Sequence, residues 1–430
     1  MRFEVGGVTQ AAGPMAGTRG GPDTGSRLGF ALLAYMLVVT FMVTLLPLHF
    51  TWPAQWRVLL VGSPVDIFAN VLLFVPLGFL FRLARSDARR TPVIAAVMAG
   101  ALLSATIETV QFFEVARTSS LIDIGANAFG AGLGALAFGR IASMRRAGGR
   151  IIGRLALELP LMGLIYLMVP LLWIASLATH GQHARILTTF VLGAFGAILL
   201  GGMQRAYFGP VRGAQARDTA GFAGLWFLAG AFPVLVWRPF ELACAAGAVA
   251  LTCWVLGARR VKDGASNRRF EVPLLKVAAP VYAIYLTLIT LLPLAGRAGA
   301  WHMAFGFPHT TSHQVEILRV LEIAAAFTLV GYMVAEFRGR TVERYRHALP
   351  RLVLWSVSLV IVVETVRGYD AVQGASVARG ALTIAAALYG GWLYYLQRAH
   401  VVRLLSRGSA ARSAEGGSDV AGPPAVVRQG

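Results

Sequence analysis

Three pairs of carboxylate and amide side chains lie inside stretches of the chain that are otherwise apolar. The partners in each pair are three or four residues apart: Asp66 with Asn70, Glu108 with Gln111, and Asp123 with Asn127. On a helix, these spacings place both side chains of a pair on one face. A charged group at a bilayer centre costs about 2.5 to 3.5 kcal/mol on insertion scales, so such groups mark candidate functional sites.

The residue types define the chemistry that such a site would perform. Asp66, Glu108 and Asp123 are candidate catalytic acids or bases, and the guanidinium of Arg117 suits a phosphate or a carboxylate. The predicted substrate-binding set has seven members: Asp66, Asn70, Glu108, Gln111, Arg117, Asp123 and Asn127. The other interpretation is an internal network of salt bridges and amide hydrogen bonds that only holds the helices in register.

The elements that position these residues are apolar runs of membrane-spanning length. Of the 430 residues, 57% are hydrophobic and only 14% are charged, which is typical of a membrane protein. We predict an all-α, polytopic transmembrane bundle of about twelve spans. They lie near 29–49, 65–83, 91–113, 121–139, 155–178, 186–206, 221–237, 240–257, 274–295, 314–335, 350–366 and 377–397.

Arginine and lysine residues concentrate in the loops after the even-numbered spans. Examples are Arg82 and Arg85 after the second span and Arg140 after the fourth. The positive-inside rule makes these loops cytoplasmic and predicts that both termini are cytoplasmic. All three polar pairs then lie at one level, near the extracytoplasmic surface. The net charge of +19 is spread between the apolar runs, so we predict no nucleic-acid partner.

An internal parallel repeat divides the chain. Glu108-Thr-Val-Gln111 resembles Glu364-Thr-Val-Arg367, and Val65-Asp66-Ile matches Val315-Glu316-Ile. The second copy is degenerate. The positions of Asn70, Asp123, Asn127 and Gly134 fall opposite Val320, Arg379, Thr383 and Gly390. We therefore predict a 4+4+4 arrangement of spans, with these segments: a disordered N-terminus 1–27, four-helix units 28–140, 150–260 and 274–398, and a disordered tail 408–430.

The first unit, residues 28–140, resembles the VanZ-like family of four-helix membrane proteins. The resemblance rests on Asp66, the run Asn70-Val-Leu-Leu-Phe-Val-Pro-Leu-Gly78, Glu108-Thr-Val-Gln111, Arg117, and the stretch from Asp123 to Gly134. Residues 275–397 resemble a decayed second copy. The resemblance implies a link to resistance against the glycopeptide teicoplanin, and it implies no defined reaction.

Three classes of function stay open at this point. The first is binding or handling of a lipid-linked glycan precursor or a glycopeptide in an outward-facing pocket of a bacterial cytoplasmic membrane protein. The second is an enzyme that modifies an envelope glycan or lipid, with Glu108 or Asp123 as acid or base. The third is a structural subunit of an envelope or polysaccharide assembly.

Metal, cofactor and thiol chemistry find little support. His309, His313 and Glu316 are the best metal-ligand candidates, but the HExxH pattern is missing and Pro308 interrupts a helix. No phosphate-binding glycine motif follows a strand, and no nucleophile elbow is present. We therefore predict no metal and no cofactor, and we expect Cys244 and Cys253 to be buried small hydrophobic residues.

Overall fold

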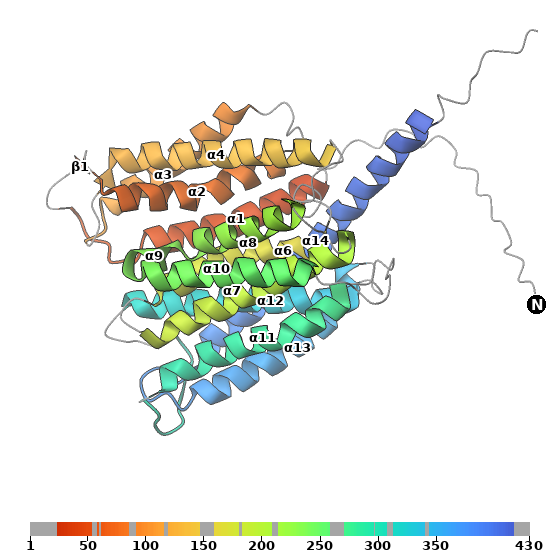
Figure 1. The fold of residues 1–430 in the computed structure, drawn as a ribbon. Helices are drawn as coiled ribbons and strands as arrows, with labels where there is room; N and C mark the ends of the chain where they lie inside the picture. Colours follow the sequence, from red (N-terminus) through yellow and green to blue (C-terminus); the bar gives the residue numbers. More distant parts are fainter. Residues whose placement is uncertain are drawn as a thin grey trace, which may run out of the picture.

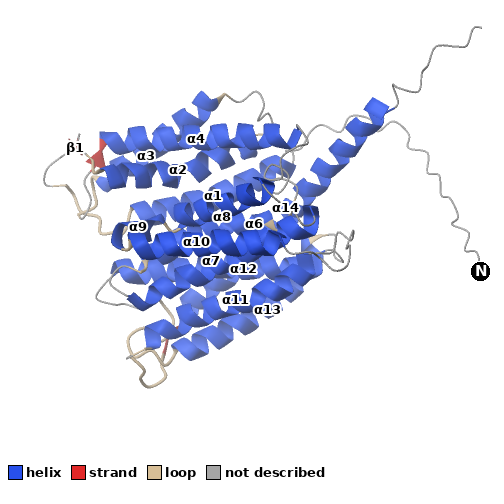
Figure 2. Ribbon diagram, in the orientation of Figure 1, coloured by secondary structure: helices blue, strands red, loops and turns tan. Residues whose placement is uncertain are grey.

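The computed structural model describes residues 24–53, 58–59, 62–85, 92–115, 119–146, 159–179, 183–208, 214–258, 271–295, 297–307, 313–339 and 344–416. Within these ranges the chain is almost entirely helical (Figure 1, Figure 2), which confirms the predicted all-α fold. Nine of the described helices are long and apolar enough to cross a membrane. The chain is therefore a multi-pass membrane protein.

The helices and strands have the following bounds. The first third contains α1 (Thr24–Thr44), β1 (Val58–Leu59), α2 (Pro64–Ala84), α3 (Val93–Gln111), β2 (Ser119–Ser120) and α4 (Leu121–Arg146). The middle contains α6 (Met162–Leu177), η1 (His183–Arg185), α7 (Ile186–Phe208), α8 (Ala214–Gly230), α9 (Phe232–Trp237) and α10 (Pro239–Ala258). The last third contains α11 (Glu271–Leu291), η2 (Leu292–Leu294), β3 (Met303–Ala304), α12 (His313–Gly339), α13 (Tyr345–Arg367), β4 (Ala375–Ser376) and α14 (Val377–Gly416).

The helices run side by side in one bundle, with α2, α3 and α4 on one side and α11 and α13 on the other (Figure 1). Helices α6, α7 and α12 lie between them, and α6 is buried along almost its whole length. Helix α1 packs on α14 as well as on α2. The hydroxyl of Tyr389 donates to the carbonyl oxygen of Ala31 at 2.6 Å, and the rings of Tyr35 and Tyr389 stack 6.4 Å apart.

Three predicted spans differ from the helices that form. The span at 155–178 contains the shorter α6, and 221–237 is divided at Ala231 into α8 and α9 because Pro233 begins a new helix. Helix α14 continues to Gly416, past the predicted span end at 397 and past residue 408, where the disordered tail was expected. Twelve spans, 4+4+4 units and cytoplasmic termini stay predictions, and residues 1–23 and 417–430 lie outside the described residues.

Within the described residues, four short strands precede α2, α4, α12 and α14, and we call the end of the bundle where these helices begin, marked by β1 in Figure 2, the strand end. Strand β1 pairs in parallel with β2, joining Val58 to Ser119, and β3 pairs in parallel with β4, joining Met303 to Ala375. Each two-stranded pair ties the loop before one long helix to the residues that begin another. The N-termini of α2, α4, α12 and α14 are thereby held at the strand end.

Glycines bring two helix pairs into backbone contact. A Cβ atom at Gly78 of α2 would lie 1.9 Å from the carbonyl oxygen of Ala131 of α4, and one at Gly134 would lie 1.9 Å from that of Val75. Helices α12 and α14 repeat this contact at Gly331 and Gly390, where the distances would be 1.7 and 1.8 Å. Small residues that allow such close approach are a recurrent basis of helix association in membranes.

These contacts correct one part of the predicted repeat. Gly78 and Gly331 occupy equivalent places, each against an alanine carbonyl of the neighbouring helix. Counting back twelve residues along each helix places Asp66 opposite Arg319, and not opposite Glu316. The match of Val65-Asp66-Ile with Val315-Glu316-Ile is therefore wrong by about one helical turn. The two tripeptides are similar in sequence because both helices begin with mixed apolar and acidic residues, and this similarity gave the wrong alignment.

We predict that Gly78→Ala disrupts the packing of α2 on α4. The added methyl group overlaps a backbone oxygen that cannot move independently, so the helices must separate, at a cost of roughly 1 to 3 kcal/mol or more. The matched control is Gly125→Ala in α4, where an added Cβ meets no atom within 4 Å and alanine favours the helix. Thermal unfolding in detergent should show a lower Tm for the first variant only. Equal Tm values would contradict the close approach.

Candidate functional site

The first polar pair begins α2. Ser63 caps this helix, because its hydroxyl oxygen accepts the backbone N–H of Asp66 at 3.1 Å. The same hydroxyl donates to Oδ2 of Asp66 at 2.7 Å, and Pro64 occupies the first turn. The Asp66 carboxylate is thus fixed near the positive end of the helix dipole. Asp66 is exposed at the strand end.

Asp66, Asn70 and Asp123 are brought together across α2 and α4. The Asn70 side chain and the Asp66 carboxylate both lie close enough to influence the carboxyl group of Asp123. Asn70 and Asp123 are each partly exposed. Two carboxylates and one amide from adjacent helix N-termini therefore share a single surface at the strand end.

Glu108 lies behind this surface and is buried. Its Oε2 atom accepts the backbone N–H of Ser120 at 2.7 Å, and its carbonyl oxygen accepts the Ser119 hydroxyl at 2.7 Å. These bonds join the end of α3 to the start of α4 through β2. The described contacts therefore make Glu108 a residue that positions Asp123, three residues beyond Ser120.

The remaining predicted residues lie deeper or make backbone contacts. Asn127 donates through Nδ2 to the hydroxyl of Ser104 at 2.8 Å, and both residues are buried. Gln111 donates through Nε2 to the carbonyl oxygen of Thr44 at 2.9 Å, which ties α3 to α1. Arg117 lies outside the described residues. The structure therefore groups the six described residues of the predicted seven into an outer set (Asp66, Asn70, Asp123) and a supporting set (Glu108, Gln111, Asn127).

An aromatic side chain lies beside the C-terminal end of α3. Trp52 is 80% exposed, and its ring lies 5.6 Å from that of Phe113 in an edge arrangement. The backbone around it is held by the bond from the N–H of Thr51 to the carbonyl oxygen of Phe113 at 2.7 Å. Trp52 was not among the predicted site residues, because it lies in a loop where tryptophan commonly marks a membrane interface.

Further buried acids, among them Glu114 and Glu322, were also missed by the sequence-based prediction. Glu114 is buried, and neither carboxylate oxygen finds a hydrogen-bond partner among the residues that the structure describes. Glu322 of α12 is buried and pairs with Arg185 at the start of α7. A signal for Glu322 existed, since it lies inside an apolar span together with Arg319, and charged groups there are costly.

The second copy of the repeat keeps the hydrogen bond that Glu108 makes in the first copy, but it has a different residue at the position of Asp123. Glu364 accepts the backbone N–H of Ser376 at 2.8 Å, as Glu108 accepts that of Ser120. Arg379 stands where Asp123 stands in the first copy. Its guanidinium binds both carboxylate oxygens of Glu364, at 2.9 and 2.7 Å, and Arg379 is 1% exposed. This position is therefore filled by a closed ion pair.

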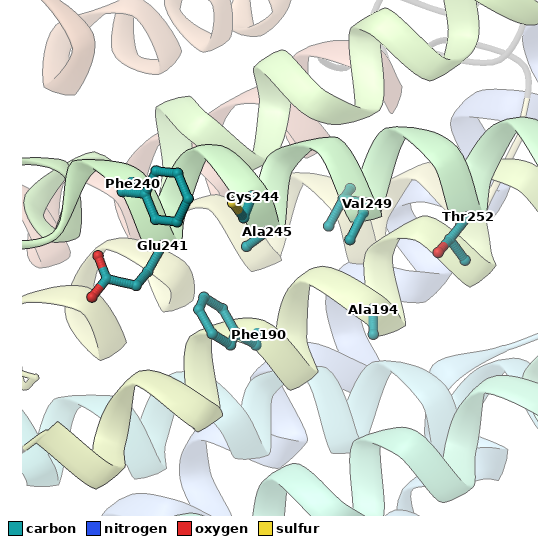
Figure 3. A pocket seen from close by; sticks show the side chains of 9 residues that line it. Phe190, Ala194, Phe240, Glu241, Cys244, Ala245, Val249 and Thr252 are labelled. Carbon is teal, nitrogen blue, oxygen red and sulfur yellow. The ribbon is translucent and has the colours of Figure 1, made fainter.

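One groove elsewhere in the described residues is apolar. It measures about 440 Å³ and lies between α7 and α10, with Glu241 near one end and Phe190, Cys244 and Thr252 along it (Figure 3). Cys244 is exposed there, which corrects the expectation that both cysteines are buried; Cys253 is buried. None of the predicted site residues lines this groove.

Residues 29–143, which include all seven predicted site residues, match the family model described as VanZ/LLP1. This segment is a VanZ-like domain. Neither a curated protein nor a solved structure matches the chain. The VanZ-like domain thus comprises α1 to α4 up to residue 143, and it carries the outer set at the strand end.

The VanZ-like domain offers hydrogen-bond acceptors and no described metal cluster. Among the residues that the structure describes, no group of three His, Cys, Asp or Glu side chains is placed to hold a metal ion. His309 lies outside these residues, so the His309, His313 and Glu316 set stays an untested alternative. Chemically, the outer set can accept hydrogen bonds from hydroxyl or amino groups, or exchange a proton between two nearby carboxylates.

We predict that Glu364→Gln destabilises the protein strongly, because it leaves the buried Arg379 without a counter-charge. Breaking one partner of a buried pair costs about 3 to 5 kcal/mol. The double substitution Glu364→Gln and Arg379→Met should recover most of that loss. Unfolding of both variants in detergent, completed as a double-mutant cycle with Arg379→Met, measures the coupling. Additive effects would contradict the closed ion pair.

Proposed function

We propose that the chain is a VanZ-like protein of the bacterial cytoplasmic membrane whose strand end binds the glycan part of a lipid-linked cell-envelope precursor. The observation that carries the proposal is the shared surface of Asp66, Asn70 and Asp123, with the exposed Trp52 in the adjacent loop. The multi-pass fold supplies the membrane setting. The proposed ligand is defined by the chemistry of this surface.

Sugar hydroxyl groups match the outer set. Carboxylates accept hydrogen bonds without donating, and the Asn70 amide both donates and accepts. Hydrogen bonds to charged groups contribute about 1.5 to 3 kcal/mol each. The exposed indole of Trp52 adds a flat apolar face with a donor at one edge, a residue type favoured at binding surfaces. A glycopeptide such as teicoplanin also carries sugar, and in this form the resistance link belongs to the proposal.

The side of the membrane follows from charge. Arg82 and Arg85 end α2, and Arg140 lies toward the end of α4 that is remote from the strand end. The positive-inside rule puts these ends in the cytoplasm. The strand end then faces outward, where an exported envelope precursor presents its head group.

The juxtaposed carboxylates also favour a second candidate function. When two carboxyl groups are close, repulsion favours protonation of one and so separates an acid from a base. A membrane enzyme acting on an envelope glycan or lipid would use Asp66 and Asp123 in this way, with Glu108 positioning Asp123. Turnover of the bound ligand distinguishes this function from binding alone.

The orientation predicts which introduced cysteines react from outside the cell. In a variant with Cys244 and Cys253 replaced by alanine, a cysteine at exposed Ala300 should be modified by a membrane-impermeant maleimide in intact cells. A cysteine at Ser143, exposed near the opposite end of α4, should react only after the membrane is opened. The reverse pattern would place the strand end in the cytoplasm.

We predict that Asp123→Asn and Trp52→Ala each weaken binding of a polyprenyl-diphosphate-linked disaccharide by about tenfold, the loss expected for one strong hydrogen bond or one anchor residue. The matched control is Phe129→Ala, an exposed aromatic residue further along α4, which should bind normally. Native mass spectrometry in detergent measures the bound fraction, with the same polyprenyl diphosphate without sugar as second ligand.

The outcomes separate the three functions. Sugar-dependent binding that is lost in Asp123→Asn supports the proposal. Conversion of the bound ligand by the wild type, absent in that variant, supports the enzyme. Failure of the stable wild type to bind the sugar-bearing ligand contradicts the proposal and supports a structural subunit.

A further inference from the structure

We propose that a buried arginine cluster at the strand end, outside the VanZ-like domain, binds a phosphate group. The cluster consists of Arg185 before α7, Arg319 in α12 and Arg367 at the end of α13, with the exposed Arg297 at the surface. These residues come from three different helices that converge between the middle helices and the second copy. The site is separate from the outer set of Asp66, Asn70 and Asp123.

Arg319 is the central observation. It is 6% exposed, its Nε atom has no hydrogen-bond partner among the residues that the structure describes, and no ion pair joins it to an acid there. An unpaired charge buried in a protein is strongly unfavourable. Its presence two turns inside an apolar helix therefore indicates an anion that completes the site.

The acids within electrostatic range of Arg319 are already committed to other partners. These acids are Glu322 and Asp370. Glu322 accepts Arg185 at one carboxylate oxygen and the Tyr285 hydroxyl, at 3.2 Å, at the other. Oδ1 of Asp370 accepts the backbone N–H groups of Val372 and Gln373 at 3.0 and 3.3 Å. Neither acid forms an ion pair with Arg319.

The charged side chains around Arg319 carry a net positive charge. Arg185 and Arg297 both lie close enough to repel Arg319, and Arg367 lies near Arg185, Arg379 and Glu322. The Nε atoms of Arg185 and Arg367, like that of Arg319, lack described hydrogen-bond partners. With the exposed Arg297, five arginines (185, 297, 319, 367 and 379) accompany four carboxylates, of which Glu316, Glu322 and Asp370 are buried and Glu364 is partly buried. One added anion would balance this set.

Phosphate fits this arrangement better than a single carboxylate does. Several guanidinium groups converge, and a phosphate presents three or more acceptor oxygens to their planar donor forks. The surface nearby carries the exposed aromatic residues Trp301, Phe305 and Phe307 in the loop before α12. Exposed aromatic residues at a helix end are typical of the membrane interface, the level of lipid phosphates. The phosphate source is therefore a lipid head group or free phosphate.

The test is the thermal stability of the full chain in lipid nanodiscs. In discs of a neutral galactolipid, which carries no phosphate, the wild type should unfold at a lower temperature than in discs that also contain phosphatidic acid. Stabilisation by phosphatidic acid only identifies a lipid phosphate; stabilisation by added inorganic phosphate as well identifies free phosphate. Stabilisation by neither would overturn the proposal.

The variants assign the effect to the cluster. Arg319→Gln should weaken the apparent affinity for the stabilising phosphate by about tenfold or more, the loss of one charge-assisted contact, and should not lower the Tm without phosphate. Arg238→Gln is the matched control, because this arginine before α10 already pairs with Glu241 at 2.9 Å. A phosphate effect that persists unchanged in Arg319→Gln would overturn the proposal.

A second measurement covers failure of the variant to fold. Phosphorus NMR and native mass spectrometry of the wild type report bound phosphate directly, and a protein free of phosphate at saturating phosphatidic acid and inorganic phosphate would refute the site. The result is independent of glycan binding, since Asp123→Asn should leave the phosphate effect intact.

Discussion

The close approach of α2 to α4 at Gly78 and Gly134 determines how the VanZ-like domain is built. Backbone contact between the helices leaves no room for side chains at the crossing, and Asp66, Asn70 and Asp123 lie beyond it at the strand end. There, the capping hydroxyl of Ser63 and the carboxylate of Glu108 satisfy the N–H groups that begin α2 and α4. Asp66 and Asp123 lie in the first turns of these two helices and therefore come close to each other.

The second copy of the repeat keeps these backbone contacts but carries side chains of opposite charge. Glycines again join α12 to α14, and Glu364 again accepts the first serine N–H. At the equivalent positions, however, Arg319 replaces Asp66 and Arg379 replaces Asp123. A backbone architecture that presents acids in one half of the protein presents cations in the other. The two halves therefore carry side chains of opposite charge at equivalent positions, in line with the two different ligands proposed for them.

The sequence predicts a structural feature well when that feature depends on residues that are close together in the chain. Apolar length predicted the helices, and acids and amides at spacings of three and four predicted the outer set of Asp66, Asn70 and Asp123. It was uninformative where a role depends on a partner from a distant segment. The pairing of Arg185 with Glu322 joins α7 to α12, and the register of the repeat depends on the carbonyl that Gly331 touches. Pattern alone also could not locate the end of α14, since small polar residues near 408 suit either a tail or a helix.

The contact of α1 with α14 has a consequence for biosynthesis. Tyr389 of α14 stacks on Tyr35 of α1 and donates a hydrogen bond to the carbonyl oxygen of Ala31. A ribosome releases α1 into the membrane long before α14 is made, so one flank of α1 stays against lipid until α14 arrives. The VanZ-like domain therefore acquires this neighbour only after its own four helices have been synthesised.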